Sequence, residues 1–134
     1  MTSRIDLTSL HRALATLDEA LVARSRAPED KFIRDACIQR FEYTYELTHK
    51  MLRRYLEATE PAGVKELSFP NLIRLGYERS LLAQSWDFWA NIRDARNATS
   101  HAYDEAKAAE VVAHIPAFAT ASRFLAMQIE AQQN

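Results

Sequence analysis

Cysteine, glycine and proline are scarce in this chain. Among its 134 residues are one cysteine, two glycines and four prolines. The single cysteine, Cys37, cannot form an intramolecular disulfide, which argues against a small secreted fold stabilised by disulfides. The few glycines and prolines provide too few turn signals for a sheet of many short strands. Long helices are therefore favoured.

Long apolar runs and a large excess of one charge are also missing. Charged residues interrupt every candidate helix, so none offers the roughly 20 uninterrupted apolar residues of a membrane span. The first residues, MTSRIDLTSLHRAL, contain no basic segment followed by an apolar signal run. We therefore expect a cytoplasmic protein. The net charge of −1 argues against a general nucleic-acid coating protein but permits a local basic site.

Helical periodicity is the strongest pattern that the sequence does contain. Apolar residues recur every three or four positions from Ile5 to just before Pro28, which predicts a first helix. A second, longer helix is expected from Pro28 towards Pro61, with Glu29 and Asp30 in its first turn. This second segment is apolar on more than one face, so it predicts contacts with several neighbours or with a second copy of the chain in a homodimer.

Three capping residues predict the remaining helices. Ser68 is expected to cap a third helix that extends to Leu82, and Ser85 a fourth that contains two tryptophans. Asp104 is expected to cap the last helix. Pro116 lies inside that helix, where a kink or a division into two is expected, and the tail EAQQN is expected to fray.

Together these segments predict an all-α fold. A chain of this length buries about two-thirds of its unfolded surface around one core, so we expect a single domain over residues 1–134. Its helices are expected to form an antiparallel bundle of four to five members with short connections.

The stretch RDARNATSHAYDE, residues 93–105, concentrates polar groups at the end of the fourth helix. On an unbroken helix, five steps rotate the chain by about 500°, so Arg96 and His101 would point about 140° apart. If Asp104 caps the next helix, however, the chain must leave the fourth helix near Thr99. His101 can then turn back towards Arg96. Arginine binds phosphate through a planar donor fork, and histidine transfers protons near neutral pH.

An arginine and a histidine that approach each other in this way resemble the minimum set of groups for RNA cleavage without a metal. His101 would act as general base or acid on the ribose 2′-hydroxyl and the leaving oxygen, and Arg96 would stabilise charge on the scissile phosphate. Asn97 would orient one of them. The structural alternative is that Arg96 pairs with Asp94 or Asp104, and that His101 only caps a helix end.

Two segments together carry a resemblance to a known family. RNATSHAYDE and RDACIQRFEYTYELTHKMLRRYLE closely resemble the nucleotidyltransferase substrate-binding proteins, a branch of the HEPN superfamily, and the likeness extends from about residue 10 to residue 130. The resemblance implies a HEPN-like helical bundle that dimerises. It also implies a partner, a minimal nucleotidyltransferase encoded nearby.

The resemblance further implies roles for individual residues. In HEPN proteins the arginine and histidine form an RNase site, often shared across the dimer, and these positions correspond to Arg96 and His101, with Asn97 as the polar neighbour. In related toxin–antitoxin pairs, the transferase silences the RNase by attaching AMP to the tyrosine that corresponds to Tyr103. The alternative for this branch is a noncatalytic subunit that binds a nucleotide or substrate for the transferase.

Basic residues outside this stretch are candidate RNA or nucleotide contacts. Lys50, Arg53 and Arg54 form a cluster on the second helix that could follow an RNA backbone, and Arg93 lies close to the motif on the fourth helix.

Metal and cofactor motifs are weak or missing. Glu46 and His49 have the E-x-x-H spacing of di-iron bundles, but a second such motif is not found. We interpret them as part of a solvated helix face, where Glu46 can pair with Lys50. The chain has no glycine-rich phosphate loop and no paired zinc motif. We therefore expect no metal and no cofactor, and nucleotidyl transfer has to come from another chain.

Overall fold

The computed structural model describes residues 4–134 of the chain. Within that range it contains helices and no strand, which confirms the predicted all-α class. No helix between residues 4 and 134 has the length and apolar character that a membrane span requires. The elements in chain order are α1 (Thr8–Arg26), α2 (Lys31–Thr59), η1 (Val64–Glu66), α3 (Phe69–Glu78), α4 (Trp86–Ala98), η2 (Thr99–His101) and α5 (Glu105–Gln133), where η denotes a 3₁₀ helix.

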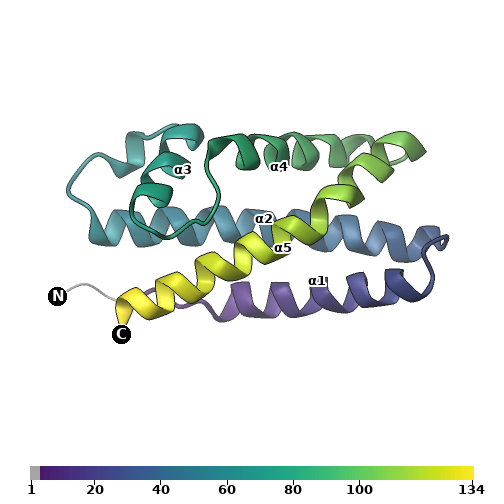
Figure 1. Ribbon diagram of the computed structural model, residues 1–134, viewed down its shortest axis with the longest axis horizontal. Helices are drawn as coiled ribbons and strands as arrows, with labels where there is room; N and C mark the ends of the chain where they lie inside the picture. Colours follow the sequence, from purple (N-terminus) through teal and green to yellow (C-terminus); the bar gives the residue numbers. More distant parts are fainter. Residues whose placement is uncertain (1–3) are drawn as a thin grey trace.

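Helices α2 and α5 form the centre of the bundle. Each spans 29 residues, and both pack against α1 and α4. In Figure 1, α5 crosses α2 obliquely, α1 lies along one side of the pair, and α3 and α4 lie along the other. Consecutive long helices run in opposite directions, as predicted. The junction between α4 and α5 therefore lies at one end of the molecule.

The start of α2 differs slightly from the prediction. Asp30 is the N-cap, and its carboxylate accepts hydrogen bonds from the backbone amides of Phe32 (2.8 Å) and Ile33 (3.1 Å). Pro28 and Glu29, which we expected in the first turn, precede the helix. A carboxylate at this position satisfies amides that have no partner within the helix, which is why Asp30 determines where the helix begins.

Helix α3 begins as predicted but ends earlier. The Ser68 side chain accepts a hydrogen bond from an amide of the first turn at 3.4 Å, as an N-cap does. The helix ends at Glu78 and does not extend to Leu82, because Ser80 adopts a positive φ of 61°, which an α-helix cannot contain. Leu81 and Leu82 are buried in the connection to α4, so their apolar character reflects core packing outside a helix.

Ser85 is the N-cap residue of α4, but its side chain makes no capping hydrogen bond within the described part of the chain. Asp104 does cap α5 as predicted, since its carboxylate accepts from the amides of Ala106 (2.9 Å) and Lys107 (3.1 Å). Pro116 does not divide α5, which is one continuous helix. Fully buried residues on both sides of the proline, Ile115 and Phe118 among them, hold both halves of the helix against the core.

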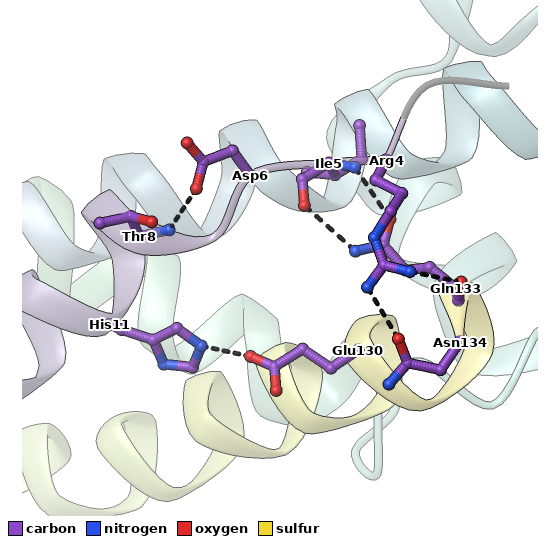
Figure 2. Close-up of polar contacts among 8 residues, drawn as sticks. All are labelled: Arg4, Ile5, Asp6, Thr8, His11, Glu130, Gln133 and Asn134. Atoms are coloured by element: carbon purple, nitrogen blue, oxygen red, sulfur yellow. Dashed lines mark hydrogen bonds and ion pairs between the residues drawn. The ribbon is translucent and has the colours of Figure 1, made fainter.

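The start and the end of the described chain are joined (Figure 2). The Ile5 amide donates to Gln133 Oε1 at 2.8 Å, and Gln133 Nε2 donates back to the Ile5 carbonyl at 3.1 Å. Arg4 donates to the Gln133 carbonyl at 3.1 Å, and His11 of α1 pairs with Glu130 of α5. The expectation that the tail frays is therefore wrong, because these contacts hold the last turn of α5.

Candidate functional site

The junction between α4 and α5 has the local geometry that the sequence predicted. Helix α4 ends at Ala98, and the 3₁₀ turn η2 follows at once. The Thr99 hydroxyl donates to the Arg96 carbonyl at 2.7 Å, and the Asp104 amide donates to the His101 carbonyl at 3.0 Å. These bonds satisfy carbonyls at the end of α4 and tie the turn to the start of α5.

Arg96 binds a residue that the sequence did not indicate. From the last turn of α4, its Nε (3.0 Å) and Nη2 (2.7 Å) both donate to Oε1 of Glu46 on α2. The expected pairing with Asp94 or Asp104 is therefore wrong, because the guanidinium extends across the helix interface. The expected pairing of Glu46 with Lys50 is also wrong, because Glu46 binds Arg96 instead. The Arg96 and Glu46 side chains are 38% and 56% exposed, so a solvent-borne ligand can reach the pair.

His101 and Tyr103 lie together on the surface beyond this pair. Their ring centroids are 6.2 Å apart at an interplanar angle of 71°, and Tyr103 is 86% exposed. Asn97 is exposed, and its carbonyl accepts a hydrogen bond from the Ser100 hydroxyl at 3.2 Å. Across residues 4–134 no hydrogen bond joins Arg96 to His101, so the approach of these two side chains to one ligand stays a prediction.

Arg93, one turn before Arg96, is held by aromatic rings. Its guanidinium carbon lies 4.9 Å from the ring centroid of Trp86 and 5.9 Å from that of Phe69. This stacking orients the long Arg93 side chain, and the guanidinium keeps its positive charge. Burial and the nearby carboxylate of Glu46 raise the pKa of Tyr45 to about 12, and the charges of Arg93 and Arg96 oppose that rise.

An open hollow of about 360 Å³ lies on α2 beside the Arg96 pair. Of the predicted basic cluster, Lys50 and Arg53 line it, whereas Arg54 is not among the residues that line it. Arg53 also donates to two carbonyls of the following connection, at 3.1 and 3.4 Å, which leaves Lys50 as the more available cation. The lining residues are Glu46, Leu47, His49, Lys50 and Arg53.

His49 connects this hollow to the core. Its ring packs against Phe69 at a centroid distance of 4.4 Å, and its Nε2 is buried. Burial and the charge of Arg53 lower the pKa of His49, so the neutral ring is favoured in the folded protein. No group of three or more metal-ligating side chains occurs between residues 4 and 134, and the Glu46–His49 spacing serves an arginine contact and core packing.

Acid is expected to destabilise the fold through His49. The pKa of His49 in the folded state lies below the ordinary value of 6.5. The stability that the buried neutral ring contributes is therefore fully present above pH 6.5 and is lost as the pH falls through the lowered pKa. Urea unfolding between pH 7.5 and 5 measures this loss, and His49→Gln should make it smaller. His114→Gln on α5 is the control. Equal pH dependence in wild type and His49→Gln would contradict the prediction.

The fold and the site define an α-helical bundle protein with Arg96 and His101 at the junction of α4 and α5. Arg96 is paired there with the carboxylate of Glu46, which also lines a partly basic hollow. Residues 5–131 match the family described as nucleotidyltransferase substrate binding protein like. The chain therefore belongs to the nucleotidyltransferase substrate-binding protein family, a branch of the HEPN superfamily.

Individual relatives agree with this assignment. A Haemophilus influenzae protein named probable ribonuclease HepT is 33% identical over 140 residues, which cover 96% of this chain and 94% of the relative. A solved Haemophilus influenzae structure, described as the fold of a substrate-binding domain of a nucleotidyltransferase, has a TM-score of 0.84 at 30% identity and covers 93% of this chain and 99% of its own. A solved Thermus thermophilus structure has a TM-score of 0.68 at 33% identity, with coverage of 90% and 98%.

Proposed function

We propose that the protein is a metal-independent endoribonuclease and the toxin of a toxin–antitoxin pair. The observation that carries the proposal is the α4–α5 junction, where exposed His101 and Tyr103 follow directly on an arginine that solvent can reach. The relative named as a probable ribonuclease, which matches almost the full chain, supports the same activity.

In the proposed reaction, His101 removes the proton of the ribose 2′-hydroxyl, and the 2′-oxygen attacks the adjacent phosphorus. The bond from phosphorus to the 5′-oxygen breaks, that oxygen takes a proton from the protonated His101 or from water, and a 2′,3′-cyclic phosphate forms. Arg96 stabilises the charge that develops on the phosphoryl oxygens. Asn97 orients one of these groups. No step uses a metal, so cleavage of labelled RNA in EDTA, with no partner present, is the direct test.

We propose a separate minimal nucleotidyltransferase as the partner and Tyr103 as the residue that it modifies. The family description and the solved substrate-binding domain both refer to such an enzyme. The Tyr103 oxygen would attack the α-phosphate of ATP and release pyrophosphate. The high exposure of this side chain supports access by a second protein.

Incubation with the partner and ATP is expected to add one or more AMP units to the wild type and none to Tyr103→Phe. Intact-protein mass spectrometry measures the gain. Tyr77→Phe is the matched control, since Tyr77 is also exposed, and it should be modified like the wild type. An unmodified wild type under these conditions would exclude Tyr103 as the target.

A homodimer is also part of the proposal. Helix α2 buries residues in the core and in addition presents Phe32, which is 89% exposed, and Tyr43 to solvent. Apolar residues on several faces of one helix are typical of a helix that contacts more than its own bundle. Sedimentation equilibrium should give twice the chain mass, and a monomer across the working concentration range would refute it.

The second candidate is a noncatalytic subunit that presents a nucleotide to the transferase. The hollow beside Arg96 favours it, because about 360 Å³ is within the range of small-ligand sites. Calorimetry separates the candidates. Nucleotide binding that is lost in Arg96→Ala, together with no RNA cleavage, indicates the subunit, whereas cleavage without nucleotide binding indicates the nuclease.

A further inference from the structure

Glu46 has two cationic neighbours and binds one of them. Its Oε1 accepts both hydrogen bonds from Arg96 of α4. Lys50 lies four residues later on α2 and lines the same open hollow as Glu46. A glutamate four residues before a lysine is the favourable order for an ion pair along a helix. A short side-chain movement therefore leads from one partner to the other.

The present pairing occupies the donors that an anion would use. Nε and Nη2 form the side of the guanidinium fork that binds phosphate through two oxygens, and Glu46 holds both with a single oxygen. A phosphate group could offer one oxygen to each donor, which is the better geometry. Because two anions repel each other at one fork, the carboxylate has to leave when phosphate takes both donors.

The exchange costs little because the pair is exposed. Half-exposed ion pairs contribute weakly to stability, since water screens both charges. The same water-exposed hollow gives the carboxylate access to Lys50. Movement to Lys50 keeps the carboxylate paired after Arg96 is released, so Glu46 has a cationic partner in both arrangements.

We infer that Glu46 is an exchangeable carboxylate that controls the anion affinity of Arg96: it binds Arg96 in the free protein and moves to Lys50 when a phosphate group binds. The inference rests on the proposed function for the source of that phosphate, an RNA strand or a nucleotide. It makes Glu46 a specificity residue. Ligands that offer a single oxygen gain nothing over the carboxylate already present, whereas phosphate does.

Titration with inorganic phosphate and with 5′-AMP at low ionic strength tests the competition. Glu46→Gln should bind each about two- to fivefold more tightly than the wild type, which corresponds to the loss of an exposed ion pair as competitor. Glu42→Gln, one turn earlier on α2, should bind like the wild type. Arg96→Ala should remove the binding. Unchanged or weaker binding by Glu46→Gln, binding that survives Arg96→Ala, or no binding by any variant overturns the inference.

Lys50→Gln tests the exchange itself. In the wild-type background it should weaken phosphate binding, because Glu46 loses its second partner and stays on Arg96. In the Glu46→Gln background it should have no effect. Equal weakening in both backgrounds would mean that Lys50 binds the anion directly, and would refute the exchange. These titrations need no catalysis, so a failure of RNA cleavage is recognised separately from a failure of the exchange.

Discussion

His101→Ala is expected to lower the rate of RNA cleavage by about 10²- to 10⁴-fold. This is the range that a positioned general acid or base contributes. The side chain is exposed at the end of η2, where its ring lies edge to face near that of Tyr103 and is not part of the buried core. Its removal should therefore abolish proton transfer and leave the bundle intact. Single-turnover cleavage of labelled RNA in EDTA gives the rate.

His114→Gln is the matched control for this experiment. His114 lies on α5, away from the junction, and its replacement should leave the cleavage rate unchanged. Circular dichroism should give the same helix content for the wild type and both variants. If His101→Ala cleaves at the wild-type rate, the histidine has no catalytic role and the RNase proposal is wrong in its central step.

Phe118→Ala is expected to cost about 3–5 kcal/mol of unfolding free energy. Phe118 is fully buried, and its ring contacts those of Phe41 (5.1 Å, edge to face), Tyr45 (6.1 Å) and Trp89 (6.3 Å). It thereby joins α5 to α2 and α4. Small domains are stable by about 5–15 kcal/mol in total, so this loss would leave many molecules unfolded at moderate temperature.

Urea unfolding followed by circular dichroism measures the effect. Phe118→Leu, which keeps most of the side-chain volume, should cost clearly less, and Met127→Ala should change the free energy by no more than about 0.5 kcal/mol because Met127 is exposed. If Phe118→Ala is as stable as Met127→Ala, the three-helix contact does not hold the core together.

Most of the local structure could be predicted because its causes are local. Asp104 and Ser68 begin helices in the structure as they do in the prediction, since a capping side chain acts on amides two or three residues away. The exit of the chain from α4 near Thr99 follows from the same reasoning. Two of the wrong expectations have non-local causes. Leu82 is apolar because the core covers it, and Pro116 is tolerated because buried neighbours hold α5 together.

The candidate site also has one part that the sequence could predict and one part that it could not. Arg96, His101 and Tyr103 lie within eight residues of one another, so their spacing was visible before the fold was known. Glu46 precedes Arg96 by 50 residues, and no pattern of spacing connects them. The sequence assigned Glu46 to Lys50 because those two residues share a helix. Only the packing of α4 on α2 brings the guanidinium to the carboxylate.

The sequence by itself determined the helical class, the places where most helices begin, and the polar motif at the α4–α5 junction, because these depend on contacts along a few neighbouring residues. The tertiary structure decided which charge Arg96 binds, which basic residues line the hollow, and how the two ends of the described chain are joined. Those features depend on which faces of distant helices meet, and burial of the whole apolar core selects these faces.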